Sequence, residues 1–397
     1  MEDAAAFVDH PLRYEEDGEG RKKDKVNGAD DAVVGASGGR KNGLESIHAL
    51  AREGSWKLAL EKCIDFLQVQ VDEREMMAGN CYYALALFKT RRYIDCLATM
   101  EDVQKAIGVT NDRELSMDMP FLMHLMKALC AFYLENFSLA EELLHNLFFF
   151  TKDRYLAGGL DDADCTGDRT GIPSASLDAS LDMQANQETR RNIWGMRASL
   201  VCRVLSNVYL SRKRYTLALH WINLMVQTAD CETLSLSLAV QVLLSIGEVE
   251  EASALLDDLR ESVKEDTCDP SGHENQYDLI STCEGLVKFT QEDYKGATRC
   301  FAAYMHKHKN NPIAANNLAV CHMYGQELSI AIQILEESTQ QGLTSQLGET
   351  SVLNLCSMYE LSTLSATEKK KSLRRWIISN GPDDFDLAAT KVVFPTT

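Results

Sequence analysis

Apolar residues recur at helical spacing along most of this chain, and short groups of turn-forming residues interrupt them. After each interruption, a large apolar or aromatic residue is followed three positions later by a small residue. The small residues are Ala59, Cys96, Ala140, Ala218, Ala252, Ala297 and Ala331. The aromatic residues of the pattern include Tyr93, Phe137, Tyr215 and Tyr294. The intervals from Ala218 to Ala252 and from Ala297 to Ala331 are both 34 positions. The pattern therefore predicts repeated units of two helices joined by a short turn.

Close packing of two antiparallel helices explains why the third position is small. The axes of packed helices approach to within about 8–10 Å, and Ala or Cys on the second helix permits that distance. Nine positions before the aromatic residue, the first helix often carries another small residue. These residues are Ala84, Ala128, Ser206, Gly285 and Ala319. We therefore predict that the small and aromatic positions pack the two helices of each unit together.

This arrangement resembles the tetratricopeptide repeat family, whose unit is a helix–turn–helix with small residues at the helix crossing. Leu205-Ser206 followed by Tyr209, Tyr215 and Ala218 is one good match, and Asn316-Asn-Leu-Ala319 followed by Ala331 is another. The resemblance implies an all-α fold, a right-handed tetratricopeptide-type superhelical solenoid of about eight helical hairpins. The last hairpin is expected to combine Val352–Leu361 with a basic helix that follows it.

Changes of composition along the chain predict four segments. Residues 1–42 are polar and Gly-rich and are expected to form a disordered acidic tail. Residues 43–157 are expected to hold N-terminal helical repeats, and residues 158–187 an acidic flexible loop. Residues 188–397 are expected to hold C-terminal tetratricopeptide repeats with a basic capping helix. The start of the chain, Met1–Gly20, has no apolar core of a signal peptide.

The C-terminal part of the chain resembles the subunit-twelve family of the trafficking protein particle (TRAPP) complex. The resemblance is carried by Asn354-Leu-Cys-Ser-Met-Tyr-Glu-Leu361, the basic stretch Lys369–Trp376 and the ending Asp384–Ala389. It implies a scaffold or adaptor subunit of a TRAPP III-type tethering complex in ER-to-Golgi traffic and autophagy. The implied partners are other TRAPP subunits, which promote nucleotide exchange on a Rab GTPase. The implied location is cytoplasmic, peripheral to the ER–Golgi intermediate compartment and the Golgi.

Composition and motifs argue against several other functions. The net charge of −19 argues against non-specific nucleic-acid binding, because phosphates require a basic surface. The 12 cysteines form no C-x-x-C pair and are expected to be buried reduced thiols. The chain has no phosphate-binding loop and no H-E-x-x-H motif. We therefore expect no enzyme activity, no cofactor, no metal site and no small-molecule substrate.

Two features suggest how the chain binds a protein partner. Arg203 and Asn207 are four residues apart, as in repeat domains that clamp a C-terminal carboxylate. At the positions taken as equivalent in later repeats, Leu238, Leu279 and Cys283, no polar or basic group completes the clamp. A generic co-chaperone or adaptor that binds peptide ligands therefore stays as the alternative function.

The second feature is an apolar inner face on the later repeats. Its candidate partner-binding residues are Leu210, Leu286, Phe289, Met323 and Tyr324. The alternative is that neighbouring helices cover them.

The basic helix predicted from Thr367 to about Ser379 also has two interpretations. Its five cations could contact an anionic membrane surface, which would make the protein at most peripherally membrane-associated. The helix could instead cap the open end of the solenoid, which requires a polar outer face. The sequence favours the cap, because the strongly negative net charge opposes membrane docking.

Overall fold

The structure is a computed structural model that describes residues 38–69, 73–108, 115, 119–157, 187–226, 232–265, 273–308, 311–341, 347–362 and 365–392. These residues form 16 α-helices and a short 3-10 helix, with no strand among them. The chain divides between Val201 and Cys202 into two compact units. Each unit has its own buried apolar residues.

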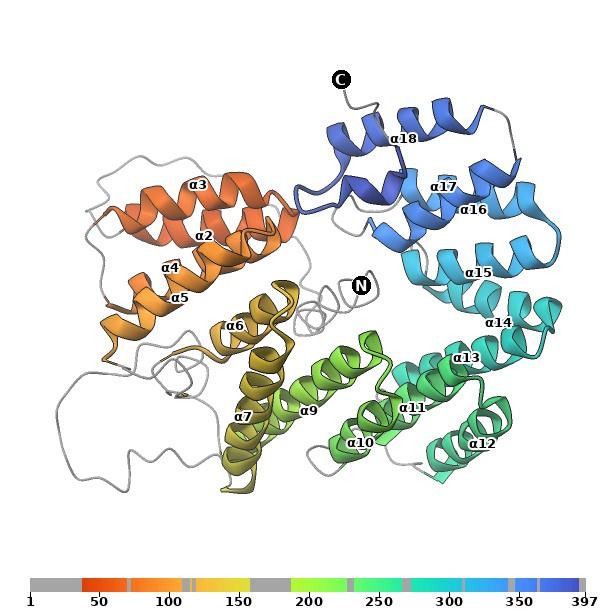
Figure 1. Ribbon diagram of the computed structural model, residues 1–397, viewed down its shortest axis with the longest axis horizontal. Coiled ribbons are helices and arrows are strands. Elements are labelled where there is room, and N and C mark those ends of the chain that lie inside the picture. The colour runs from red at the N-terminus through yellow and green to blue at the C-terminus, as the bar shows by residue number, and fades with distance from the viewer. Residues whose placement is uncertain are drawn as a thin grey trace, which may run out of the picture. The chain divides into compact units, whose positions relative to one another are not determined.

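The helices pair in chain order into eight hairpins (Figure 1). The first three are α2 (Gly38–Glu53) with α3 (Trp56–Leu67), α4 (Glu73–Lys89) with α5 (Tyr93–Ala106), and α6 (Phe121–Tyr133) with α7 (Phe137–Leu156). The next three are α9 (Gln187–Ser211) with α10 (Tyr215–Val226), α11 (Glu232–Ile246) with α12 (Val249–Glu265), and α13 (His273–Thr290) with α14 (Tyr294–Lys307). The last two are α15 (Pro312–Tyr324) with α16 (Leu328–Gln341), and α17 (Glu349–Ser362) with α18 (Ala366–Asn380). The 3-10 helix η3 spans Leu387–Thr390.

One turn geometry closes the first seven hairpins. The residue two positions before each second helix has a left-handed backbone, with φ between 58° and 97°. In the second hairpin, the Arg91 N–H donates to the Phe88 carbonyl (3.0 Å) and the Arg92 N–H to the Leu87 carbonyl (2.9 Å). The other six turns repeat this pair of bonds, which is the Schellman ending of a helix. The left-handed residues are Gly54, Arg91, Glu135, Lys213, Gly247, Glu292 and Gln326.

These turns predict opposite effects of glycine at two equivalent positions. Lys213→Gly is expected to stabilise the C-terminal unit by about 0.5–1 kcal/mol, because glycine adopts the left-handed conformation without steric cost. Gly247→Ala is expected to destabilise it by about 1 kcal/mol through the same strain. A Cβ atom on Gly247 would meet no atom within 4 Å, so backbone conformation alone decides the outcome. Thermal unfolding followed by circular dichroism measures the melting temperatures of both variants. Shifts of the same sign would contradict a left-handed backbone at both positions.

The helix crossings bury the small residues of the sequence pattern. All seven, from Ala59 to Ala331, are 1% exposed or less. In two hairpins a polar atom bridges the crossing: the Cys96 Sγ donates to the Ala84 carbonyl, and the Ser206 Oγ donates to the Ala218 carbonyl, both at 3.2 Å. A larger side chain at either position would separate the helices and break this contact.

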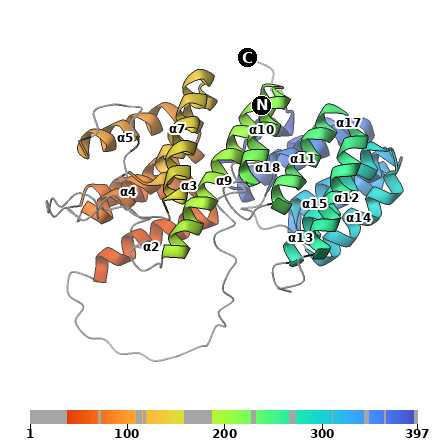
Figure 2. The ribbon, with the colours of Figure 1, turned by 90° about the horizontal axis from the view of Figure 1, so that it is seen from below.

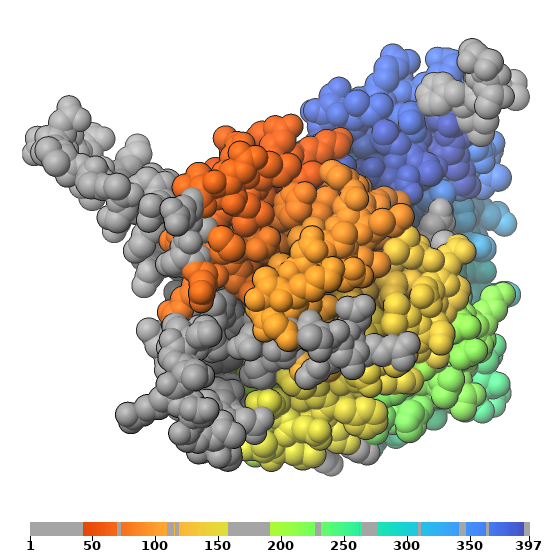
Figure 3. Space-filling model, turned by 60° about the vertical axis from the view of Figure 1, so that its left-hand side comes forward, coloured from red at the N-terminus to blue at the C-terminus, as the bar shows by residue number. Residues whose placement is uncertain are grey.

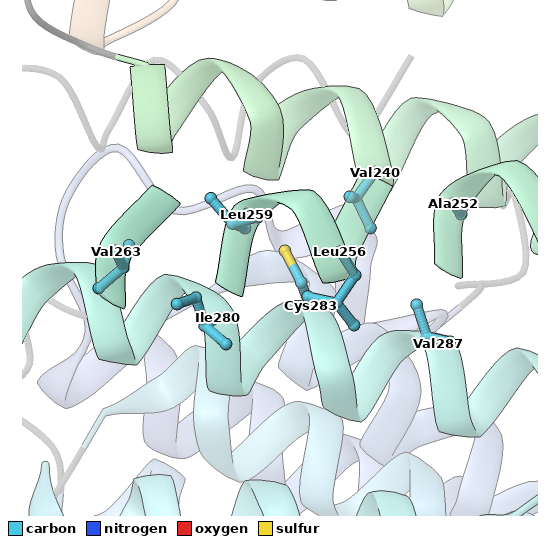
Figure 4. Packing of buried hydrophobic residues seen from close by; sticks show 8 residues of the cluster. All are labelled: Val240, Ala252, Leu256, Leu259, Val263, Ile280, Cys283 and Val287. Carbon is cyan, nitrogen blue, oxygen red and sulfur yellow. The ribbon is translucent and has the colours of Figure 1, made fainter. Parts of the chain in front are cut away.

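Each second helix packs against its own first helix and against the first helix of the next hairpin. In the C-terminal unit, α12 packs on both α11 and α13, which also contact each other, and the three helices are neighbours in Figure 1 and Figure 2. Figure 4 shows their shared core, in which Leu256 and Leu259 of α12 face Val240 of α11 and Cys283 of α13. The hydrophobic core thus extends from one hairpin to the next, as in a repeat fold. The predicted all-α, tetratricopeptide-type fold is confirmed.

The same rule holds in the N-terminal unit. Helix α3 packs on α2 and α4, and α5 packs on α4 and α6. Figure 3 shows the close side-chain packing along α2 to α7, coloured from red-orange to yellow. The cores of these hairpins include large side chains that are almost completely buried, such as Met100, Leu144 and Phe148.

Some predicted boundaries can be compared with the helices. Helix α2 begins at Gly38, so the last residues of the predicted tail are helical, while residues 1–37 lie outside the described residues. Residues 158–186 of the predicted loop, including the aspartates of its acidic run, also lie outside them, and Gln187 begins α9. The basic helix spans Ala366–Asn380 and packs on α17. No helix in the described ranges has the length and apolar character needed to cross a bilayer.

Candidate protein-binding surface

The first helices of the C-terminal hairpins form one layer, and the predicted partner-binding residues lie on it. Helix α11 contacts α13, and α15 contacts α17. The ring of Phe289 on α13 lies 5.2 Å from the ring of Tyr324 on α15. Consecutive first helices therefore present a shared surface. The predicted residues on these helices are Arg203, Asn207, Leu210, Leu286, Phe289, Met323 and Tyr324.

Most of the predicted apolar residues are half-buried by neighbouring helices. Leu210 packs against the cluster that contains Ile222, Ala239 and Val242. Leu286 and Phe289 pack beside Phe301 and Cys321, and Met323 packs beside Leu335 and Met358. Tyr324 differs from these four because it is 52% exposed. The structure therefore uses Leu210, Leu286, Phe289 and Met323 largely to join helices, and Tyr324 offers an aromatic surface.

An aromatic stack joins neighbouring hairpins and was not predicted from the sequence. Phe289, Tyr294 and Tyr324 contact one another, with ring centroids 5.2 to 5.7 Å apart. In the N-terminal unit, Tyr93 and Tyr133 stack at 4.9 Å and both contact Phe88. The sequence does contain a pattern that could have predicted these contacts. A Phe lies five positions before the aromatic residue of the second helix, at Phe88, Phe132 and Phe289. Such ring pairs add about 0.5–1.5 kcal/mol each beyond their buried area.

The structure corrects the positions used to judge the carboxylate clamp. Cys283 is buried in the core between α11 and α13, so its side chain is not on the surface that carries Asn207. Counted from the small residue at the crossing, the equivalents of Asn207 are Gln241, Leu286 and Val320. One equivalent is polar and two are apolar. Arg203 and Asn207 are half-buried on α9, and a carboxylate clamp there stays a prediction.

A charged network links α12 and α13 next to this layer. Glu284 of α13 accepts from the Lys288 Nζ at 2.6 Å and lies 3.1 Å from a guanidinium nitrogen of Arg260 on α12. Arg260 also contacts Asp257 at 2.7 Å. The hydrogen bond from Lys288, followed by that from Arg260, lowers the pKa of Glu284. The network therefore holds an ionised carboxylate between two cations.

This network predicts a contribution to stability that is lost in acid. Because the folded pKa of Glu284 is lowered, its contribution is present above the ordinary Glu pKa of about 4.3 and is lost as the pH falls through the lowered value. Glu284→Gln should lower stability at pH 7 by about 1 kcal/mol or less, since the pair is partly exposed. When urea unfolding is measured from pH 7 to pH 3, the free energies of unfolding of the variant and the unchanged chain should become equal in acid. Glu292→Gln is the control, because Glu292 is exposed on the same hairpin. Its free energy of unfolding should depend on pH in the same way as that of the unchanged chain.

Most of the described cysteines are buried, and His308 contacts a carboxylate. Burial raises the pKa of Cys63 and Cys283 to about 12 and is the largest cause that raises the pKa of Cys321 and Cys356 to about 11. These thiols are protonated at neutral pH and are poor nucleophiles. His308 contacts the Asp278 carboxylate at 2.6 Å, and Lys307 contacts it at 2.8 Å. Within the described ranges, no group of three or more His, Cys, Asp or Glu side chains could hold a metal ion.

The basic helix α18 uses several of its cations inside the fold. The Lys370 Nζ donates to Glu360 at 2.7 Å and to the Lys391 carbonyl at 3.2 Å. Arg374 donates to the Leu387 carbonyl at 2.8 Å. The Lys369 Nζ lies 4.8 Å from the centre of the Tyr359 ring. These contacts support the cap interpretation, because side chains held this way are not directed at a membrane.

Sequence comparison places the chain beside one group of curated proteins. No family model matches it. Mouse trafficking protein particle complex subunit 12 is 26% identical over 210 residues, which are 53% of this chain and 26% of the mouse protein. The human protein of the same name is 25% identical over 215 residues, 54% of this chain and 28% of the human protein. The chain is therefore weakly similar in sequence to TRAPP subunit 12 over about half of its own length. The match spans about a quarter of the length of these relatives.

Solved structures with similar helices are repeat proteins of low similarity. The C-terminal part of a TPR repeat-containing protein from Cytophaga hutchinsonii is 11% identical, with a TM-score of 0.33, over 78% of this chain and 98% of that one. The APC/C hetero-tetramer Cut9–Hcn1 contains a chain that is 14% identical, with a TM-score of 0.35, over 85% of this chain and 66% of that one. Because these scores are low, the fold rests on the helices, turns and crossings described above.

Proposed function

We propose that this chain is a non-catalytic scaffold or adaptor subunit of a TRAPP-related vesicle tethering complex. The weak homology to TRAPP subunit 12 over about half of the chain carries the proposal. The helical repeats support it physically, because stacked hairpins offer an extended surface for protein partners. Its partners are then other subunits of the complex.

The finer assignment is a TRAPP III-type complex in ER-to-Golgi traffic and autophagy. In this assignment other subunits catalyse nucleotide exchange on the Rab GTPase, and the chain holds them in place. The chain acts at the cytoplasmic side of Golgi and ER–Golgi intermediate membranes through its protein partners. The internal contacts of Lys370 and Arg374 agree with attachment through proteins rather than through a basic helix.

Affinity purification tests the partner assignment. The full chain is tagged at its own genomic locus, and quantitative mass spectrometry compares the purified proteins with those from an untagged strain. We expect co-enrichment of several TRAPP subunits. Recovery of chaperones without any TRAPP subunit would contradict the proposal and favour the co-chaperone alternative, in which Arg203 and Asn207 bind a peptide carboxylate.

A nucleotide-exchange assay tests the non-catalytic role. The purified full chain is added to a Rab GTPase loaded with a fluorescent GDP analogue, and release of the analogue is followed in time. We expect release at the spontaneous rate with the chain alone and faster release with a purified TRAPP core. Acceleration by the isolated chain would show that the scaffold assignment is wrong.

A further inference from the structure

The fourth hairpin is basic, although the chain as a whole carries a net charge of −19. From residue 189 to residue 229, the sequence has seven arginine and lysine residues and no aspartate or glutamate. Three of the seven, Arg212, Lys213 and Arg214, follow one another in the turn between α9 and α10. Lys213 and Arg214 are exposed. The turn is therefore a local positive surface on an acidic protein.

An exposed hydroxyl group follows this turn directly. Thr216 is the second residue of α10, and its side chain is exposed. Arg214 and Lys213 lie two and three positions before it, and Leu217, the next residue, is 41% exposed. Protein kinases select their acceptor hydroxyls by such patterns of charge. Thr216 thus has the sequence surroundings of a phosphate acceptor for a kinase that selects basic residues.

The structure separates Thr216 from a second hydroxyl with similar surroundings. Only Thr216 and Ser372 have a cation at both the second and the third preceding position in the sequence. Ser372 lies in the interior of α18. Lys370, two positions before it, is buried and donates to Glu360 and to the Lys391 carbonyl. A kinase could use Lys370 only after these bonds and the middle of α18 had opened.

A much smaller opening exposes the segment around Thr216. Kinases hold the residues around the acceptor in an extended conformation, so the first turn of α10 must open. The Ala218 N–H donates to the Arg214 carbonyl at 3.1 Å and closes that turn. The N–H of Thr216 is among the first four of the helix, which have no acceptor within it. Opening therefore breaks only the first bonds of the helix, and helix ends open at the lowest cost.

We propose that Thr216 is phosphorylated by a protein kinase that selects basic residues before its acceptor. In this step the Thr216 Oγ attacks the γ-phosphorus of ATP, and the new O–P bond replaces the bond between that phosphorus and ADP. The hydroxyl proton passes to a base of the kinase, and ADP leaves. The proposal does not rest on the proposed TRAPP function, because the residues that carry it belong to the fourth hairpin and α18.

The phosphate changes the charge and the stability of the fourth hairpin. A phosphothreonine adds a charge of about −1.5 to −2 at neutral pH, which offsets about two of the three cations of the turn. The phosphate lies at the positive N-terminal end of α10 and close in sequence to Lys213 and Arg214. Both interactions are attractive, so phosphorylation stabilises the start of α10 and removes a positive surface.

A kinase reaction on the purified full chain tests the proposal. The chain is incubated with Mg-ATP and the catalytic subunit of cyclic-AMP-dependent protein kinase, which selects basic residues before its acceptor. Peptide mass spectrometry then locates the phosphate. We expect phosphate on Thr216 before any other hydroxyl. Thr216→Ala should remove most of the incorporated phosphate, and Ser372→Ala should leave it unchanged.

Two arginine variants test the role of the turn. Arg214→Ala keeps the acceptor and should slow phosphorylation about tenfold, the effect of losing one charge-assisted hydrogen bond to the kinase. Arg92→Ala is the matched control, because Arg92 is exposed and directly precedes the second helix of its own hairpin, as Arg214 does. It should leave the rate unchanged. Mapping on the unaltered chain remains decisive if a variant folds poorly.

Thermal unfolding measures the effect of the phosphate on stability. The phosphorylated chain should melt about 1–4 °C higher than the untreated chain, because the phosphate interacts with the helix end and the turn cations. The difference should shrink in high salt, which screens these interactions. A lower melting temperature after phosphorylation would show that the phosphate does not lie at a positive helix end.

The chain purified from cells completes the test. We expect phosphate on Thr216 when the tagged chain is isolated in the presence of phosphatase inhibitors. The proposal is overturned by phosphate on Ser372 in place of Thr216 in the kinase reaction, or by unmodified Thr216 in the cellular chain. Unmodified Thr216 in a chain that co-purifies with TRAPP subunits would overturn this proposal alone. Phosphorylated Thr216 in a chain without TRAPP subunits would overturn the proposed function alone.

Discussion

Replacing Phe301 with alanine lowers the free energy of unfolding of the C-terminal unit by about 3–5 kcal/mol, the range for removing a buried aromatic side chain. The ring is 2% exposed and fills the space between the two helices of the sixth hairpin and α15. It packs beside Ala297 and against Leu318 and Cys321. The hairpin cannot close this space, because the turn and the crossing fix the distance between α13 and α14.

Urea unfolding followed by circular dichroism measures this loss. Ile330→Ala on α16 is the control, because that side chain is exposed and should change stability by about 0.5 kcal/mol or less. Gly285→Ala tests the same contact from the other side. A Cβ atom there would lie 2.7 Å from the Phe301 ring, so the change should destabilise by about 1–3 kcal/mol, although Gly→Ala normally stabilises a helix. A stable Phe301→Ala variant or a stabilising Gly285→Ala change would contradict the crossing geometry.

Replacing Ile377 with alanine opens the terminal hairpin, at a cost of about 2–5 kcal/mol. Ile377 of α18 is 2% exposed and packs with Val352, Cys356 and Ala389. Ala389 belongs to η3, which packs on α17 and α18 as α17 packs on α15 and α16. The segment that follows α18 thus covers the face where a further first helix would stack, and Ile377 lies beneath it.

The neighbouring residue is the matched control for this variant. Ile378 is 62% exposed, so Ile378→Ala should change stability by about 0.5 kcal/mol or less. Hydrogen exchange should show faster exchange in α17 and α18 of Ile377→Ala, with α11 and α12 little changed, because repeat proteins unfold locally from their ends. Equal protection in the two variants would show that the segment after α18 does not cover this face.

Local patterns made the repeat predictable from the sequence. The small residue at each crossing and the turn before it depend on residues a few positions apart, and these were sufficient to place the hairpins. The left-handed conformation at Arg91 or Lys213 was not predictable in the same way, because neither residue favours it. The repeat geometry imposes it, and the Schellman bonds offset its cost.

The candidate surface was harder to predict, because it depends on contacts between distant residues. Phe289 and Tyr324 belong to the same apolar pattern, yet one is half-buried and the other is exposed. Cys283 was taken as an equivalent of the clamp positions, but its side chain is buried between α11 and α13, and the position equivalent to Asn207 on α13 is Leu286.

Sedimentation of native cell lysate most directly tests the claim that the chain is a scaffold subunit of a TRAPP-related complex. Gradient fractions are probed for the chain and for a TRAPP core subunit. The account predicts that the two proteins sediment together as a large complex, and that the core subunit moves to smaller sizes when the chain is deleted. Sedimentation of the chain as a single protein, with the core subunit unchanged by its deletion, would contradict the account.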